Sequence, residues 1–269
     1  MAHKPESSGR TALVTGASSG IGEALARCFA GGGFDLVLVA RSADKLKALA
    51  DELRGGHGVA VQVMPADLCV PGAAATLAAA LRRKRVTVDV LVNNAGVLEQ
   101  GAFCDIAAAR QQQQIDLNVS ALTAMLAQFV PGMRERGWGR VLNVASIAAF
   151  QPLPSLATYA ATKAYVLSLS EALSVELDGS GVTVSALCPG VTATALIGPA
   201  SSAADKLGSL PEFMIGQAAE VAAQGYQACL RGDVICVPGR LNRVASLLAR
   251  AAPRRLLRRV GAAATRDYL

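Results

Sequence analysis

Short runs of apolar, mainly β-branched residues recur along the chain and alternate with longer segments of helical periodicity. The apolar runs predict strands at residues 11–15, 35–40, 58–64, 88–93, 139–145, 182–188 and 233–237. The segments between them predict helices over residues 20–31, 42–54, 71–84, 105–136, 155–178 and 217–231. Strand runs that are apolar throughout are typical of strands covered on both faces. The alternation therefore predicts an α/β fold, a three-layer doubly wound Rossmann fold with a parallel sheet of about seven strands.

The composition favours one large domain, because the 269 residues are 52% apolar and only 17% charged. We divide the chain into an N-terminal segment (1–9), a single domain (10–238) and a C-terminal extension (239–269). No run reaches the roughly 18 apolar residues of a transmembrane helix, and the N-terminus has no apolar stretch typical of a signal peptide. We therefore expect a cytoplasmic protein.

Cysteine and histidine give no sign of disulfides or metal. The six cysteines are dispersed without a C-x-x-C pair, and we expect them to be small buried hydrophobes. His3 and His57 are the only histidines, and neither has a partner at a metal-binding spacing. We expect no metal site.

The positive charge is concentrated near the C-terminus. Residues 240–259 hold seven arginines and no acid, so of the net charge of +6 the rest of the chain contributes about −1. The apolar positions among these arginines are Leu241, Val244, Leu248, Leu256 and Leu257. This pattern predicts one or two amphipathic helices, broken near Pro253.

Three interpretations of this extension stay open. It packs on the body by its leucines, or it touches anionic lipid or an acyl-chain carrier, or it binds nucleic acid. Nucleic acid is disfavoured, because no aromatic platform or binding motif accompanies the charge. We expect no nucleic-acid partner.

The segment TGASSGIG, residues 15–22, joins the first predicted strand to the first predicted helix. Its glycines fit a turn that lets a phosphate reach backbone N–H groups at a helix N-terminus, with Ser18 and Ser19 as further donors. The same residues also fit the G-x-S-x-G turn of serine hydrolases, with Ser18 as nucleophile. A hydrolase needs an acid and then a histidine downstream, and only His57 follows. Because this would confine the triad to the first fifth of the chain, the phosphate-binding interpretation is preferred.

The end of the second predicted strand carries a cation where many dinucleotide-binding folds carry an acid. The strand ends in FDLVLVARS, so Ala40 takes that place and Arg41 and Ser42 follow it. An acid there binds the adenosine ribose hydroxyls of NAD. A cation and a hydroxyl suit a 2′-phosphate instead, so Arg41 and Ser42 favour NADP(H) over NAD(H).

Tyr159 and Lys163 are four residues apart and share one face of a predicted helix. A phenol is a poor base at neutral pH, but a nearby ammonium favours the phenolate and lowers its pKa. Such a tyrosine can exchange a proton with an alcohol or a carbonyl. Ser146 ends the preceding strand, and its hydroxyl could hold the substrate oxygen.

Taken together, these motifs resemble those of the short-chain dehydrogenase/reductase family over roughly residues 9 to 240. The matching segments, in order, are TGASSGIG at 15–22, DL at 67–68, NNAG at 93–96, Ser146 with YAATK at 159–163, and PGVTAT at 189–194. Asn118 matches the fourth member of the family's catalytic group. The resemblance implies reversible hydride transfer between NADP(H) and a carbonyl or secondary alcohol.

The resemblance also implies roles for single residues. Tyr159 would be the general acid and base, Lys163 would hold the nicotinamide ribose, and Asn118 would hold a water linking Lys163 to solvent. The residues implied at the cofactor, besides Tyr159 and Lys163, are Gly16, Ser18, Ser19, Gly20, Ile21, Gly22, Arg41, Ser42, Asp67, Leu68, Asn93, Ala95, Gly96, Pro189, Gly190, Val191, Thr192 and Thr194.

One departure from the family pattern concerns the cofactor. NADP-preferring relatives often carry Lys or Arg just before the second motif glycine, and this chain has Ser19 there. The NADP(H) preference therefore depends mainly on Arg41 and Ser42. A protein that binds NADP(H) as a sensor without turnover is the alternative, and the complete catalytic group weighs against it.

The substrate is expected to be a small molecule, an apolar or bulky carbonyl compound such as a ketone, a ketoacyl compound or a steroid-like molecule. The candidate walls of its pocket are Leu98, Phe150, Leu153, Leu196, Ile197, Phe213 and Met214. Residues 192–216 have no clear period and are a candidate lid over it. The resemblance further implies a homodimer or homotetramer built through the helices predicted at 105–136 and 155–178.

Overall fold

A seven-stranded sheet forms the centre of the structure, a computed structural model that describes residues 9–192, 216–253, 255, 257 and 258. The strands are β1 (Thr11–Thr15), β2 (Asp35–Ala40), β3 (Val61–Pro65), β4 (Val90–Asn93), β5 (Gly139–Val144), β6 (Val182–Leu187) and β7 (Ile235–Cys236). Their order is β3-β2-β1-β4-β5-β6-β7, and every neighbouring pair is parallel. The order in which the strands are added to the sheet reverses between β1 and β4, and ligands of open α/β sheets bind beside such a reversal. The predicted fold is confirmed.

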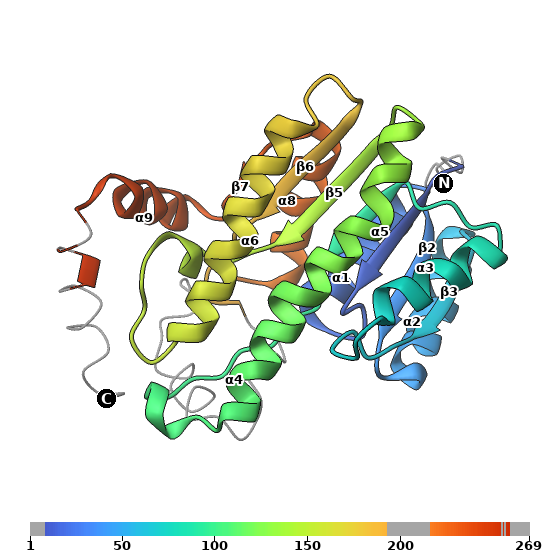
Figure 1. The fold of residues 1–269 in the computed structure, drawn as a ribbon. Helices are drawn as coiled ribbons and strands as arrows, with labels where there is room; N and C mark the ends of the chain where they lie inside the picture. The colour runs from blue at the N-terminus through green and yellow to red at the C-terminus, as the bar shows by residue number, and fades with distance from the viewer. Residues whose placement is uncertain (1–8, 193–215, 254, 256, 259–269) are drawn as a thin grey trace.

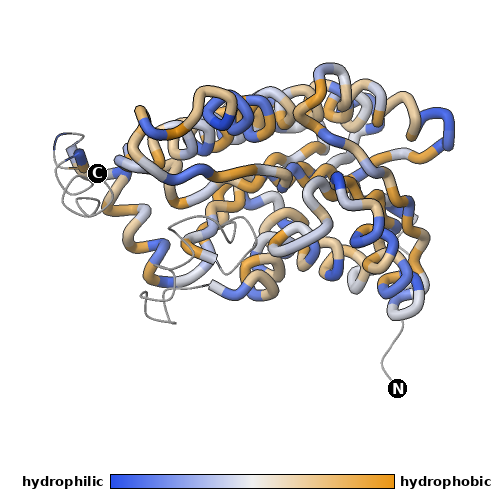
Figure 2. The backbone as a smooth tube through the Cα atoms, turned by 90° about the horizontal axis from the view of Figure 1, so that it is seen from below, coloured by the Kyte–Doolittle hydropathy of each residue, from blue (hydrophilic) through white to orange (hydrophobic). Residues whose placement is uncertain are grey.

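Helices cover both faces of this sheet (Figure 1). One face carries α1 (Gly20–Gly31), α2 (Ala43–His57) and α8 (Ala218–Arg231), and the other carries α3 (Ala73–Arg83), α5 (Leu122–Glu135) and α6 (Ala157–Glu176). Strand side chains alternate between the two layers: Leu36 and Leu38 pack with the first set of helices, and Val37 and Val39 with the second. Figure 2 shows the hydrophobic strands between the two helical layers.

Two predicted helices differ from the observed ones. We expected the second to stop at Arg54, but α2 continues through two glycines to His57 and ends at Gly58, whose φ of +69° is left-handed. The helix expected over 105–136 consists of α4 (Ala108–Ile115), a π-helical turn η2 (Asp116–Ala121) and α5. Such π-helical turns often occur at functional sites.

The C-terminal helix α9 (Arg240–Ala251) lies beside the short helix η3 (Ile147–Phe150), at the edge of the fold in Figure 1. It ends two residues before Pro253, where the break was predicted. Packing on the body through the leucines, one of the three interpretations left open, is wrong for Leu241 and Leu248, because both are exposed. The buried face of α9 carries polar Ser246 instead.

The cysteines are all free thiols, in agreement with the expected absence of disulfides. Cys188, Cys229 and Cys236 are buried, and Cys104 is exposed, so the expectation of burial is wrong for Cys104. In the part of the chain that the structure describes, no helix is both long enough and apolar enough to cross a bilayer.

Candidate active site

The glycine-rich turn between β1 and α1 is held by side chains from two neighbouring strands. The hydroxyl of Thr15 donates to the Val92 carbonyl (3.2 Å) and accepts from the backbone N–H groups of Asn94 and Ala95 (3.0 Å each). The Asn94 amide Nδ2 donates to the carbonyls of Thr15 (3.0 Å) and Gly16 (3.3 Å). Thr15 and Asn94 thus fix the turn to β4. Neither role was predicted from the sequence, although each residue lies in a motif at a strand end.

The same turn has the space and the donors that a dinucleotide pyrophosphate needs. Gly16 has a φ of +65°, and a Cβ placed there would lie 2.7 Å from Asn94 Nδ2. Ser19 is the N-cap of α1 but makes no side-chain capping bond, so it leaves the N–H groups of the first turn of α1 without that acceptor. These N–H groups lie at the carboxyl end of β1, beside the reversal of strand order. The residues therefore fit a dinucleotide cofactor.

The residues expected at the adenosine end lie together beside this turn. Ala17 N–H donates to the Val39 carbonyl (3.2 Å), which ties the turn to the end of β2, and Ala66 N–H donates to the Ala40 carbonyl (3.0 Å). Arg41 and Asp67 follow directly, and both are exposed. Asp67 also accepts from the Cys69 N–H (3.0 Å), which fixes its own turn. This edge of the sheet therefore carries an exposed cation and an exposed carboxylate.

The candidate catalytic side chains lie after the carboxyl end of β5, on α6 and, for Asn118, in η2. Ser146 follows β5 in an extended conformation and caps η3, where its Oγ accepts from Ala148 N–H (3.1 Å). Tyr159 and Lys163 lie in the first two turns of α6 and are 8% and 5% exposed. Lys163 Nζ donates to the Val144 carbonyl (2.8 Å) and lies 5.7 Å from the centre of the Tyr159 ring.

Burial dominates the electrostatics of these groups. It raises the pKa of Tyr159 to about 12, and a hydrogen bond from Ser146 acts in the opposite direction. Burial also lowers the pKa of Lys163 from its ordinary 10.5 to about 8. The expectation that Lys163 lowers the pKa of Tyr159 does not hold in this structure, in which the ammonium is hydrogen-bonded to Val144. At neutral pH both groups are protonated, so Tyr159 is set up as a proton donor.

Asn118 lies in the π-helical turn η2 and is almost fully buried. Its Oδ1 accepts from Val97 N–H (2.9 Å), and its Nδ2 donates to the Val97 carbonyl (2.9 Å) and to Thr162 Oγ1 (3.1 Å). A Cβ placed at Gly96 would lie 3.1 Å from Asn118 Oδ1 and 3.5 Å from Lys163 Nζ. Gly96 therefore lets the asparagine and the lysine approach from two helices. The structure brings all four candidate catalytic residues to one place.

Asn93 contributes differently from what the resemblance implies. Its Nδ2 donates to Asn143 Oδ1 (2.9 Å), and Asn143 Nδ2 in turn donates to Ser170 Oγ (2.9 Å) on α6. This buried chain of hydrogen bonds joins β4 and β5 to the catalytic helix. The amide of Asn93 thus helps to fix the position of α6 relative to the sheet. Asn93 also lines a small recess together with Thr15, Leu68 and Ala95.

The segment from Pro189 to Thr192 connects the site to the C-terminal helix. The Pro189 carbonyl accepts from Ile147 N–H (2.9 Å), the residue after Ser146. Gly190 faces Asn242 of α9, because a Cβ on Gly190 would lie 2.5 Å from Asn242 Nδ2. Val191 is exposed, and Thr192 pairs with Gly216 across the segment considered as a lid. Thr194 and residues 193–215 of that segment lie outside the described residues.

The expected apolar walls are partly in place around Tyr159. Leu98 and Leu153 pack with Ala148, Tyr159 and Ala160. Phe150 packs into the core on the α6 side of the sheet instead, and the Arg250 guanidinium lies 6.0 Å from the centre of its ring. Leu196, Ile197, Phe213 and Met214 lie outside the described residues.

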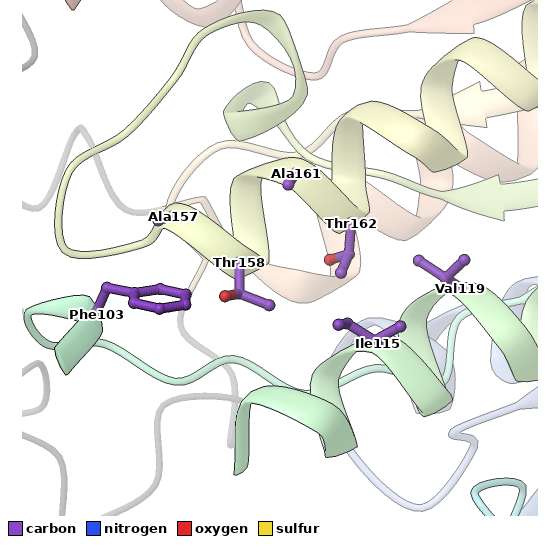
Figure 3. Close-up of a pocket in the computed structure, with 7 residues that line it drawn as sticks. All are labelled: Phe103, Ile115, Val119, Ala157, Thr158, Ala161 and Thr162. Atoms are coloured by element: carbon purple, nitrogen blue, oxygen red, sulfur yellow. The ribbon is translucent and has the colours of Figure 1, made fainter. Parts of the chain in front are cut away.

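A separate apolar groove lies between α4, η2 and α6 and has a volume of about 420 Å³. Figure 3 shows the residues that line it, which are Phe103, Ile115, Val119, Ala157, Thr158, Ala161 and Thr162. Thr158 and Ala161 lie on a different face of α6 from buried Tyr159 and Lys163. The groove is therefore on the outside of these helices and is not the pocket of the catalytic residues.

We expect the variant Lys163→Met to be more stable than the parent at pH 7. The lowered pKa corresponds to a cost of about 3 kcal/mol for keeping the buried ammonium charged, and the variant removes this cost. The variant also loses the hydrogen bond to Val144, which stabilises the parent by about 1 kcal/mol. The free energy of unfolding should therefore rise by about 2 kcal/mol. The lysine is neutral in the folded state above pH 8 and in the unfolded state above pH 10.5, so the gain shrinks between these values.

Urea unfolding at pH 7 and pH 9.5 measures the difference in the free energy of unfolding between variant and parent. The control is Lys45→Met at an exposed position of α2, which should leave the free energy of unfolding unchanged at both pH values. A variant less stable than the parent at pH 7 would show that the bond to Val144 outweighs the burial of the charge.

Comparison with known proteins matches the chain to one family over most of its length. Residues 10–205 match the family model described as short chain dehydrogenase. Oxidoreductase UcpA of Salmonella typhimurium is 39% identical over 189 residues, which cover 69% of this chain and 70% of that protein.

Solved structures give the same result. The chain resembles a short-chain dehydrogenase from Sphingobium yanoikuyae in complex with NADPH, with 37% identity, a TM-score of 0.78, and coverage of 88% of this chain and 92% of that one. It also resembles the bulky-bulky ketone specific alcohol dehydrogenase from Comamonas testosteroni, with 32% identity, a TM-score of 0.77, and coverage of 90% and 91%.

Proposed function

The chain belongs to the short-chain dehydrogenase family, and we propose that it transfers a hydride between NADP(H) and a carbonyl or secondary alcohol. The observation that carries this proposal is the convergence of Ser146, Tyr159, Lys163 and Asn118 beside a glycine turn that fits a dinucleotide. A sensor without turnover has no need of a buried, charged lysine beside a tyrosine, because burying that charge has an energetic cost.

The proposed chemistry divides between cofactor and protein. The nicotinamide, when bound, supplies or accepts the hydride. Ser146 Oγ holds the substrate oxygen, and Tyr159 donates its proton to that oxygen as a carbonyl is reduced. Lys163 contacts the nicotinamide ribose, and Asn118 holds the water that links Lys163 to solvent. Alcohol oxidation runs the same proton path in reverse.

Cofactor contacts are proposed along the carboxyl edge of the sheet. The turn from Gly16 to Gly22, with Ser18, Ser19, Gly20 and Ile21, binds the pyrophosphate through backbone N–H groups and hydroxyls. Arg41 and Ser42 bind the 2′-phosphate, and Asp67 and Leu68 line the adenine. The relative from Sphingobium yanoikuyae, whose structure contains NADPH, supports the choice of NADP(H).

Replacing Arg41 by Ala tests this assignment. We expect the parent to bind NADPH at least about tenfold more tightly than NADH, and Arg41→Ala to lose that difference while NADH affinity is unchanged. Titration of the purified protein, followed by nicotinamide fluorescence, measures both affinities. The control is Arg82→Ala, an exposed arginine at the end of α3.

Equal or tighter binding of NADH by the parent would overturn the NADP(H) preference and leave the reaction class intact. Binding of neither nucleotide would count against the reaction class itself.

The substrate is proposed to be an apolar ketone or alcohol, because Leu98 and Leu153 pack around Tyr159. The ketone-specific relative from Comamonas testosteroni supports this class.

A homodimer or homotetramer is proposed through the outer faces of α4 and α6. Their apolar groove, with Phe103 63% exposed, is a surface that a second copy would cover.

A further inference from the structure

The helix α9 turns an apolar stripe away from the body of the protein. Leu241, Val244 and Leu248 recur at i, i+3 and i+7, and Leu247 lies beside them. The exposed fractions of these side chains are 64%, 57%, 66% and 63%, in that order. A monomeric protein rarely exposes four large apolar side chains together to water, and such a patch typically marks a surface that contacts a partner or a membrane.

The other side of α9 is firmly attached. Ser246 is buried, and Asn242 lies against Gly190 and donates to the Pro238 carbonyl (2.9 Å). Arg250 lies 3.7 Å from Glu171 on α6, and Arg243 Nε donates to the Val237 carbonyl (3.1 Å). These contacts fix the orientation of the helix, and with it the direction of the stripe.

The charged residues of α9 itself, and of the sequence that follows it up to Asp267, are all arginines. Arg240, Arg243, Arg250, Arg255 and Arg258 are exposed. The sequence has no Asp or Glu between Asp233 and Asp267. An arginine-flanked apolar stripe on a helix that is held along its opposite face is the pattern of a helix that lies in the plane of an anionic membrane surface.

We infer that α9 and the arginines after it bind the surface of a membrane rich in anionic phospholipid. A second copy of the chain fits less well, because a two-fold axis through the stripe would bring the same arginines face to face. An anionic bilayer instead accepts the apolar side chains at its interface and the guanidinium groups at its phosphates. Because α9 lies on η3 and Gly190, this contact would hold the nicotinamide end of the site near the lipid, a consequence that rests on the proposed function.

Co-sedimentation with vesicles tests the inference without cofactor or substrate. We expect the full chain to bind vesicles of phosphatidylglycerol and phosphatidylcholine at least tenfold more tightly than vesicles of phosphatidylcholine alone, and to release them at high salt. Leu241→Ser with Leu248→Ser, and separately Arg255→Gln with Arg258→Gln, should each weaken this binding at least tenfold. The matched control, Arg82→Gln with Arg83→Gln on α3, should not.

The melting temperature of the variants and their particle mass in solution distinguish membrane binding from the other roles of the stripe. Because Leu241 and Leu248 are exposed, their replacement should leave the melting temperature unchanged, and a clear drop would show that the stripe packs on the body and overturn the inference. Equal binding to both kinds of vesicle, or to neither, would also overturn it. A smaller particle mass for the leucine variant in light scattering, without vesicle binding by the parent, would assign the stripe to a second copy.

Discussion

Tyr159→Phe should lower kcat of carbonyl reduction by about 10³-fold while the protein still binds NADPH with an affinity within about threefold of the parent. The change removes one hydroxyl from a side chain that is buried against Ala148, Ala160 and Leu153, so the ring and its packing stay. The pKa of about 12 keeps this hydroxyl protonated at neutral pH, so the variant removes the proposed proton donor. Steady-state kinetics and fluorescence titration measure the two quantities.

Tyr165→Phe is the matched control for this variant. Tyr165 lies on the same helix, is 39% exposed, and its hydroxyl lies 3.0 Å from Thr123 Oγ1 on α5. Its loss should leave kcat within about twofold. Tyr159→Phe and Ser18→Ala together separate the reductase from the hydrolase, because a hydrolase acting through Ser18 would keep its activity in Tyr159→Phe and lose it in Ser18→Ala. A protein that binds NADPH but shows no turnover over a broad set of ketones, even in the parent, would be a sensor.

The sheet was predictable because burial on both faces leaves a signal in the sequence. Runs such as Val37–Val39 and Val90–Val92 are apolar at every position, and both layers of helices pack on them. The end of α2 was misplaced because Gly55 and Gly56 look like a stop signal. The helix tolerates them and ends instead at Gly58, the position that needs a left-handed φ.

The π-helical turn that contains Asn118 was not predictable from the apolar pattern. One extra residue in a turn shifts the pattern by less than the variation within a helix, so residues 105–136 look like one helix. Its effect is large, because it places Asn118 Oδ1 against the Val97 N–H and beside Gly96. Motif matching found Asn118, and only coordinates show how it is positioned.

Electrostatics and surface exposure were harder still to predict. The spacing of Tyr159 and Lys163 predicts that they lie close together, but the direction of the tyrosine's pKa shift depends on how much water reaches the ring. The side of α9 that meets the body also depends on tertiary contacts, here Asn242 and Ser246, which are polar. Amphipathic periodicity favours the leucines for that role, and in this helix they face outward.

Gly22→Ala should destabilise the protein by about 2–3 kcal/mol and weaken NADPH binding at least about tenfold, although it adds a single methyl group. Gly22 is buried in the first turn of α1, and a Cβ there would overlap the Gly16 carbonyl and Asn94 Nδ2. The Gly16 carbonyl belongs to the backbone of the turn and cannot rotate away as a side chain would. The helix and the turn must therefore separate, which moves the N–H groups proposed to bind the pyrophosphate.

Gly31→Ala, at the other end of the same helix, should have the opposite effect on stability. Its Cβ would meet only His57 Cε1 at 3.7 Å, an ordinary contact, and replacing a helical glycine by alanine reduces the entropy of the unfolded chain. We expect an increase of up to about 0.5 kcal/mol and unchanged NADPH affinity. Urea unfolding and fluorescence titration of both variants test the turn directly. If Gly22→Ala were as stable as Gly31→Ala and bound NADPH normally, the close approach of α1 to the turn would not be what Gly22 provides.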